Sequence, residues 1–147
     1  MLPLVQFVAV LATTFFAGAA IYITLVEHPA RMGCSTEVAA TVWAPSYKRA
    51  TVMQASLAVI GFLAGLAAWM LGAGLVWLVA ALFILAVVPV TLIIIFPTNK
   101  QLLAPERDLG SSATRELLVK WGQLHAIRSV LGLIASAIFL WQLVGAG

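Results

Sequence analysis

The sequence predicts an all-α protein built as a bundle of four transmembrane helices. Three observations support this fold class. First, 63% of the 147 residues are hydrophobic and 9% are charged, whereas about 25% of a typical soluble domain is charged. Second, residues 1–26, 50–99 and 129–147 contain no charged side chain. Third, these stretches supply one, two and one segments of the roughly 20 apolar residues that a helix needs to cross a bilayer.

The first two helices have recognisable boundaries. We expect the first span at residues 3–26, because Pro29 disfavours an unbroken continuation of the helix. We expect residues 31–46 to form an interfacial segment between helices 1 and 2, with Trp43 at the depth of the lipid headgroups. A second span is then predicted at residues 47–71.

The second span carries a stripe of small and polar residues within a sector of about 80°, at 100° per residue. Its members are Tyr47, Thr51, Gln54, Ala58, Gly61 and Gly65. Small residues let helices approach closely. The stripe therefore predicts a tight seam in mid-membrane that becomes a polar pocket toward Tyr47, although for Gly61 and Gly65 we favour helix packing alone.

The second half of the chain follows the same pattern. A third span is predicted at residues 75–96, where Leu, Ile and Val dominate, and Pro97 ends it. A polar loop between helices 3 and 4 is centred on residues 105–112, and a helix that begins within residues 115–120 leads into the fourth span. A chain of this length has room for one bundle, so we expect a single integral membrane domain over residues 1–147.

Charge predicts the orientation of this multi-pass protein. All eight Lys and Arg residues fall within residues 31–49 and 100–128. These ranges form the loops between spans 1 and 2 and between spans 3 and 4, which lie on the same side of the membrane when four spans cross it in turn. The positive-inside rule then puts both loops in the cytoplasm and both termini on the non-cytoplasmic side of the cell membrane. The net charge of +3 flanks apolar spans. It therefore indicates contact with the lipid bilayer, and we predict no nucleic-acid partner.

Ionisable and aromatic residues gather near the predicted cytoplasmic ends of all four spans. Polar residues at that depth usually face the bundle interior and mark functional sites. The candidates are Tyr22, Glu27, His28, Arg31, Tyr47, Gln54, Asn99, Trp121, His125 and Arg128. In the alternative interpretation, Arg128 extends to the headgroups and His125 only seals a helix interface. We favour a shared pocket, because topology requires charges in the loops but not His, Asn and Trp at the helix ends.

A metal site is a weaker interpretation of the same residues. Glu27, His28 and His125 supply the ligand types of a non-haem iron centre. However, the adjacent Glu27 and His28 would point about 100° apart on a helix. The sequence also offers no ligand pair at a spacing of three or four residues. We therefore predict no cofactor, and a metal or a haem held by His28 and His125 stays open as an alternative.

Four parts of the chain carry a family resemblance. They are GAAIY at 18–22 with EHPAR at 27–31, WAPSYKR at 43–49 with MQA at 53–55, PVT at 89–91 with PTN at 97–99, and WGQLHAIR at 121–128. In this order and spacing they resemble the anthrone oxygenase-like family of small four-span membrane proteins, long catalogued as a domain of unknown function. They resemble its bacterial branch more than its fungal polyketide enzymes.

This resemblance implies oxidation of a lipophilic aromatic, an anthrone or a phenol, by O₂ without an added cofactor. An imidazole titrates near neutral pH, so His125 or His28 would remove the acidic C–H proton. Arg128 and Arg31 would stabilise the phenolate and the reduced oxygen, and Glu27 would orient His28 or pair with Arg31. The predicted substrate-binding residues are Tyr22, Tyr47, Gln54, Asn99 and Trp121.

Two classes of function remain open at the level of the sequence. The first is a membrane oxygenase with a lipophilic aromatic small molecule as its partner. The second is a non-catalytic accessory subunit whose polar residues dock helices, lipid or a larger complex. A quinone-, metal- or haem-binding bundle lies between these two. The spans carry no acidic residue of the kind that proton-coupled carriers use, and a four-span transporter would have to oligomerise. A homo-oligomer is compatible with either class.

Overall fold

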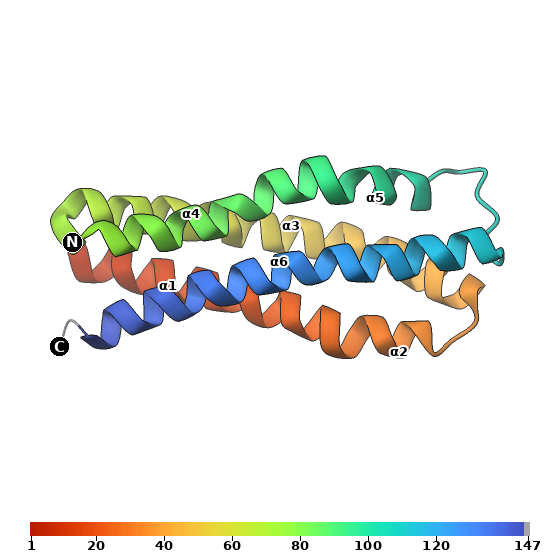
Figure 1. Ribbon diagram of the computed structural model, residues 1–147, viewed down its shortest axis with the longest axis horizontal. Helices are drawn as coiled ribbons and strands as arrows, with labels where there is room; N and C mark the ends of the chain where they lie inside the picture. Colours follow the sequence, from red (N-terminus) through yellow and green to blue (C-terminus); the bar gives the residue numbers. More distant parts are fainter. Residues whose placement is uncertain (146–147) are drawn as a thin grey trace.

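The computed structural model describes residues 1–145, and all regular structure within them is helical. The predicted all-α, four-helix class is confirmed: four helical rods are long and apolar enough to cross a membrane (Figure 1). The rods comprise α1 (Leu2–Tyr22), η1 (Ile23–Glu27) and α2 (His28–Met32); α3 (Thr36–Ala68) and η2 (Trp69–Ala73); α4 (Leu75–Pro89), η3 (Val90–Ile95) and α5 (Phe96–Leu102); and α6 (Ser112–Gly145).

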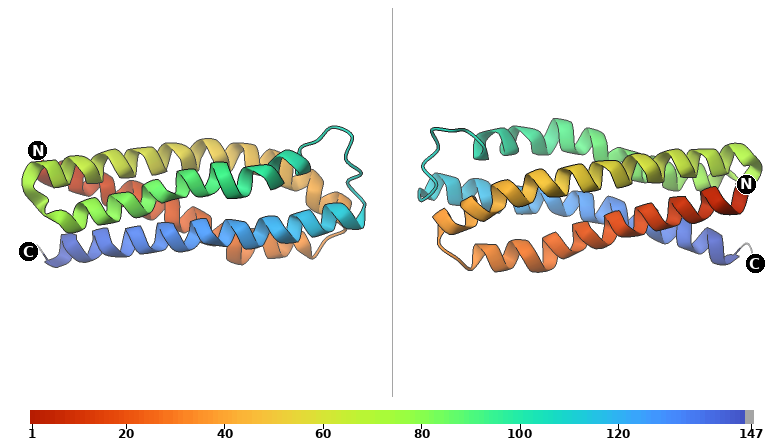
Figure 2. Two further views of the ribbon diagram at one scale, coloured as in Figure 1. Left: turned by 45° about the horizontal axis from the view of Figure 1, so that its top comes forward. Right: turned by 180° about the vertical axis from the view of Figure 1, so that it is seen from behind.

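The rods run up and down in sequence order, and each packs on two neighbours. α1 and α4 both contact α3 and α6, so the four rods form a square in which sequential rods are adjacent (Figure 2). The start of α1 and the end of α6 lie at the end of the bundle that holds the turn between η2 and α4, whereas loops 33–35 and 103–111 lie at the opposite end. We call the latter the loop end. Its cytoplasmic placement stays a prediction, which one-sided labelling of the exposed Cys34 in sealed vesicles would test.

The expected interfacial segment at residues 31–46 is not a separate element. α3 begins directly after Ser35, whose side chain accepts a hydrogen bond from a backbone N–H of the first turn. Pro45 lies inside this helix without ending it, although an internal proline removes one helix hydrogen bond and crowds the preceding turn. Trp43 is 1% exposed, so its ring faces the bundle core and not the surroundings of the bundle. Most of the segment therefore lengthens the second rod.

Two π-helical turns carry the first and third rods past a proline, so these rods are longer than predicted. In η1 the N–H of His28 bonds to the carbonyl of Ile23, five residues back, and Pro29 follows. In η3 the same type of bond precedes Pro97. A π turn shifts the hydrogen-bond register, so each proline falls in a first turn where its missing N–H is tolerated. Such turns are frequent at functional sites.

The small residues of α3 form the tight seam that the sequence predicts. A Cβ on Gly65 would lie 2.5 Å from Cζ of Phe139, and one on Gly61 would lie 2.6 Å from Oγ1 of Thr13. Glycine at these positions therefore lets α3 approach α1, α4 and α6 closely. At the end of this seam the chain reverses through Gly72 and Gly74, whose φ angles are +91° and +99°, a conformation that favours glycine.

Candidate functional site

An aromatic cluster from three rods lies toward the loop end of the bundle, and Trp121 of α6 is its centre. The Trp121 ring lies 5.1 Å from that of His28, 5.7 Å from that of Trp43 and 4.9 Å from that of His125. Tyr47 stacks on Trp43 at 5.0 Å. These centroid distances are those of favourable aromatic contacts. The structure therefore brings both predicted imidazoles to one indole ring.

Arg128 is a buried cation beside this cluster. Its side chain is 7% exposed, one terminal nitrogen donates to Oε1 of Gln54 at 2.7 Å, and its guanidinium carbon lies 5.7 Å from the ring centroid of Phe16. Within residues 1–145 the single ion pair joins Arg31 to Glu27, so no carboxylate of that part of the chain neutralises Arg128. A buried charge without a partner is unfavourable, and this position therefore favours an anion.

Arg31 lies in a different environment, because Glu27 pairs with it one helical turn earlier. Ser46 of α3 completes the group: its hydroxyl donates to Glu27 at 2.6 Å and accepts from Arg31 at 3.3 Å. Of the two roles predicted for Glu27, the geometry favours pairing with Arg31 over orienting His28. The group also joins the first rod to the second.

His125 bonds to the hydroxyl group of Thr24, which bonds in turn to a second hydroxyl group. Its Nδ1 lies 3.0 Å from Oγ1 of Thr24, which in turn lies 2.8 Å from Oγ of Ser129. In the tautomer whose Nδ1–H donates to Thr24, the lone pair of Nε2 is free to accept a proton. The partner on one ring nitrogen thus leaves the other as the available base.

A small enclosed cavity lies among these side chains, and we call it the chamber. Its volume is about 20 Å³, room for about one water molecule. The residues that line it are Ile23, Arg31, Ser46, Tyr47, Ala50, Thr51, Gln54, Trp121, His125 and Arg128. In this conformation it is far smaller than the roughly 300–1,000 Å³ of a typical ligand pocket.

Buried polar atoms without a hydrogen-bond partner concentrate around the chamber. Within residues 1–145 they are Thr13 Oγ1, His28 Nδ1, Arg31 Nε, Trp43 Nε1, Gln54 Nε2, Asn99 Oδ1, Trp121 Nε1 and Arg128 Nε. All but the atom of Thr13 belong to the aromatic cluster, the two arginines or their amide neighbours. Buried polar groups are almost always bonded. This donor-rich set is therefore suited to an oxygen-bearing acceptor.

The ten predicted residues occupy different positions around the chamber. Those that line it are Arg31, Tyr47, Gln54, Trp121, His125 and Arg128. Glu27 lies behind Arg31, and Asn99 lies behind Tyr47, to whose hydroxyl its amide donates at 3.1 Å. His28 is buried against Trp121 without lining the chamber. Tyr22 is 56% exposed and faces an outer groove.

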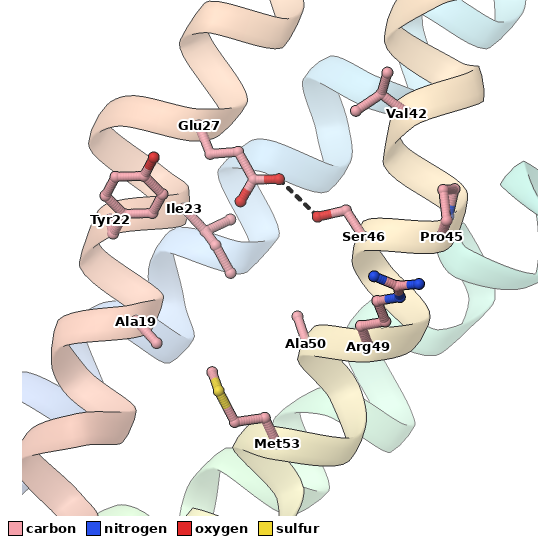
Figure 3. A pocket seen from close by; sticks show the side chains of 10 residues that line it. All are labelled: Ala19, Tyr22, Ile23, Glu27, Val42, Pro45, Ser46, Arg49, Ala50 and Met53. Carbon is pink, nitrogen blue, oxygen red and sulfur yellow. Dashed lines mark hydrogen bonds between the residues drawn. The ribbon is translucent and has the colours of Figure 1, made fainter.

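The outer groove lies between η1 and α3 and has a volume of about 550 Å³ (Figure 3). Its lining residues are Ala19, Tyr22, Ile23, Glu27, Val42, Pro45, Ser46, Arg49, Ala50 and Met53. Figure 3 shows the Ser46–Glu27 hydrogen bond, which joins its two walls. Ile23, Ser46 and Ala50 line both the groove and the chamber. These three side chains therefore separate the two spaces.

Sequence reasoning missed several residues of the site. Ser129 could have been found, because it follows His125 by four residues on one helix face; Trp43 precedes Tyr47 by the same interval. The small hydroxyls of Thr24 and Ser46 offer no comparable pattern. Gly122 has a packing role, since a Cβ there would lie 2.5 Å from the imidazole ring of His28. It lets that ring approach α6.

The structure does not assemble the alternative metal-ligand set. Within residues 1–145 no three His, Cys, Asp or Glu side chains are close enough to share an ion. Glu27 pairs with Arg31, whereas His125 bonds to Thr24. Glu27 thus belongs to a different group from the two histidines, which both contact Trp121.

Comparison with known proteins identifies the family. A family model described as anthrone oxygenase matches residues 43–138. The chain belongs to the anthrone oxygenase family. It is 29% identical over 149 residues to the anthrone oxygenase tpcL of Aspergillus fumigatus, covering 95% of this chain and 92% of the relative. It is 30% identical over 157 residues to an anthrone oxygenase of Claviceps purpurea, covering 97% and 90%. No solved structure gives a significant match.

The predicted likeness to a bacterial branch is not borne out, because both of these anthrone oxygenases are fungal. The matched range includes Trp43, Tyr47, Trp121, His125 and Arg128. Glu27 and Arg31 precede it, although the relatives align over nearly the whole chain.

Proposed function

We propose that this protein is a membrane-embedded oxygenase that oxidises a lipophilic aromatic of the anthrone or phenol type with O₂. Its membership of the anthrone oxygenase family supports the reaction class. The observation that carries the proposal is a set of unpaired buried donors on residues that line the chamber, with Arg128 as a cation that no carboxylate of residues 1–145 neutralises. These donors are Nε of Arg31, Nε2 of Gln54, Nε1 of Trp121 and Nε of Arg128. Such donors stabilise negative charge that develops on oxygen during a reaction.

The outer groove is the proposed route for the aromatic substrate. Its volume of about 550 Å³ lies in the range of small-molecule pockets, and its rim includes the exposed Tyr22 and Met53. In a membrane, a groove between two spans opens to the acyl chains, where a lipophilic aromatic is dissolved. The chamber is too small for a tricyclic ring, so Ile23 and Ala50 must move when the substrate enters.

His125 is the proposed base. Its Nδ1 is occupied by Thr24, so Nε2 takes the proton from the acidic C–H of the substrate. His28 does not line the chamber; we assign it a positioning role through its contact with Trp121. Proton removal leaves a delocalised anion whose oxygen is stabilised by Arg31 and by the phenolic hydroxyl of Tyr47.

The reaction balances without a further reductant. The anion gives one electron to O₂, and the resulting radical and superoxide combine to a peroxide bound to carbon. The imidazolium of His125 protonates the peroxide. Loss of the remaining C–H proton breaks the O–O bond, and the released hydroxide takes up that proton as water. One anthrone and one O₂ thus give one anthraquinone and one water. Arg128, with Gln54 beside it, stabilises the superoxide and peroxide.

The test follows O₂ uptake and anthraquinone formation by the purified protein in lipid nanodiscs, with an anthrone as the probe. We expect equimolar O₂ consumption. His125→Gln should lower kcat by about 10²–10⁴-fold, the usual contribution of general base catalysis. His28→Gln should lower it less, because its ring lies outside the chamber.

Folding of each variant is checked by circular dichroism and by thermal unfolding. A folded wild-type protein that consumes no O₂ with anthrone or hydroquinone probes would overturn the oxygenase proposal, and the accessory-subunit alternative would then take its place. Equal activity of His125→Gln and the wild type would overturn the assignment of the base.

A further inference from the structure

A second hollow adjoins the chamber on the side away from the outer groove. It lies between α3 and the third rod and has a volume of about 140 Å³. Its lining residues are Phe16, Thr51, Gln54, Ala55, Ala58, Val87, Val88, Thr91, Leu92 and Arg128. Thr51, Gln54 and Arg128 also line the chamber. We call this hollow the α3–α4 cleft. The chamber thus lies between two hollows of different size.

We propose that the α3–α4 cleft is the entry and holding site for O₂, separate from the route of the aromatic substrate. This inference rests on the proposed oxygenase function. It assigns to each of the two substrates its own path into the chamber, one on either side of α3.

Size separates the two hollows. The outer groove has the volume of a small-molecule pocket, whereas about 140 Å³ for the cleft falls below the roughly 300 Å³ at which such pockets begin. A tricyclic aromatic does not fit beside the side chains present. A diatomic molecule fits several times over, so the cleft can hold O₂ next to a chamber that the aromatic ring fills.

The polarity of the walls agrees with this assignment. The cleft is lined mainly by alkyl and phenyl groups, among them Ala58, Val87 and Val88. Ala55 and Leu92 at its rim are exposed, so in a membrane the cleft opens to acyl chains. Dioxygen is apolar and more soluble in hydrocarbon than in water. A dry, lipid-facing cleft therefore delivers it while admitting little water that would quench the substrate anion.

The inner end of the cleft carries the groups that reduced oxygen requires. Arg128 and Gln54 are both more than nine-tenths buried, and Nε of Arg128 and Nε2 of Gln54 have no partner within residues 1–145. Neutral O₂ gains little from these donors. Superoxide and peroxide gain much, so the site stabilises the anion that forms when the substrate transfers an electron.

Steady-state kinetics with each substrate varied in turn test the assignment. Ala55→Leu fills the cleft from its exposed rim and should raise KM for O₂ by roughly tenfold, with KM for the anthrone nearly unchanged. Ala19→Leu, on a wall of the outer groove that the chamber does not share, should show the opposite pattern. Ala137→Leu, at an exposed alanine of α6 that lines neither hollow, is the matched control.

If Ala55→Leu does not fold, Val88→Phe fills the same cleft from α4. A rise in KM for the anthrone in either variant would show that the cleft admits the aromatic, and unchanged constants would show that a lipid chain or nothing functional occupies it. Both results overturn the inference.

A measurement independent of turnover separates this inference from the proposed function. Under O₂ pressure, methyl groups next to bound O₂ relax faster in NMR spectra. In wild-type nanodiscs we expect strong O₂-dependent relaxation of the Val88 methyls, which Ala55→Leu should reduce while leaving the exposed Val76 unchanged. A lack of turnover with intact O₂ relaxation would reject the enzyme alone. Turnover without relaxation at Val88 would reject the O₂ cleft alone.

Discussion

The two halves of the bundle are built on the same four rods but differ in how they use buried space. The half that holds the termini is packed with small apolar residues around Trp77 and Phe139, whose rings lie 5.1 Å apart. Gly65 brings its backbone against Phe139 there. Polar groups are few, and Thr14 and Ser136 satisfy each other at 3.0 Å.

The loop end buries the side chains of two arginines, two histidines, two tryptophans, one glutamine and one asparagine. Seven polar atoms of these side chains have no hydrogen-bond partner within residues 1–145. The loop end also contains the π-helical turns η1 and η3, whereas the π-helical segment η2 of the packed half leads directly into the turn before α4. Unpaired buried groups lower stability. The packed half therefore stabilises the fold, whereas the unpaired polar groups of the loop end destabilise it.

Among variants that compare the two halves, the largest effect should come from removing the unneutralised cation. Arg128→Met should lower kcat by about 10²–10³-fold, the usual cost of losing one oxyanion donor, as measured by O₂ uptake. Its thermal stability should be retained, because the variant removes a buried charge that lacks a counter-ion. Lys120→Met, an exposed cation on the same helix, is the matched control and should keep full activity. A large loss of stability in Arg128→Met would show that this residue belongs to the structural core.

The next effect should appear in the packed half and leave the chamber unchanged. Gly65→Ala places a Cβ 2.5 Å from the fully buried Phe139. Overpacking of this kind typically lowers the free energy of unfolding by about 1–3 kcal/mol, which denaturation in mild detergent would measure. Gly18→Ala provides the comparison, since nothing lies within 4 Å of its Cβ. Equal stability of the two variants would contradict the tight seam.

The smallest effect concerns a polar bond that the loop end does make. Tyr47→Phe removes the hydroxyl that accepts the 3.1 Å hydrogen bond from Asn99. The free energy of unfolding should fall by about 1 kcal/mol, the net value of one such bond. A double-mutant cycle with Asn99→Leu isolates this contribution. A coupling energy near zero would mean that the bond does not join the second and third rods.

Much of the site was predictable, because residues at the ends of four serial spans must meet at common depths. This logic correctly grouped Gln54, Asn99, His125 and Arg128 near one end of the bundle. It failed for residues whose burial depends on the rotation of the helix about its axis as well as on their depth along it. Tyr22 lies at the expected level but points outward, and Trp43 was expected at the interface, although it is buried beside Trp121.

The sequence by itself determined the number of long apolar helical rods, the end that carries both loops and the set of chemically competent residues, because hydrophobicity and charge are local properties of the chain. The tertiary structure decided which of these side chains line the chamber, which donors stay unpaired and why two separate hollows reach it. Those properties depend on how far each rod is rotated about its axis and how closely rods approach. Contacts between residues far apart in sequence, such as Gly65 with Phe139 and Gly122 with His28, set both the rotation of each rod and the distance between rods.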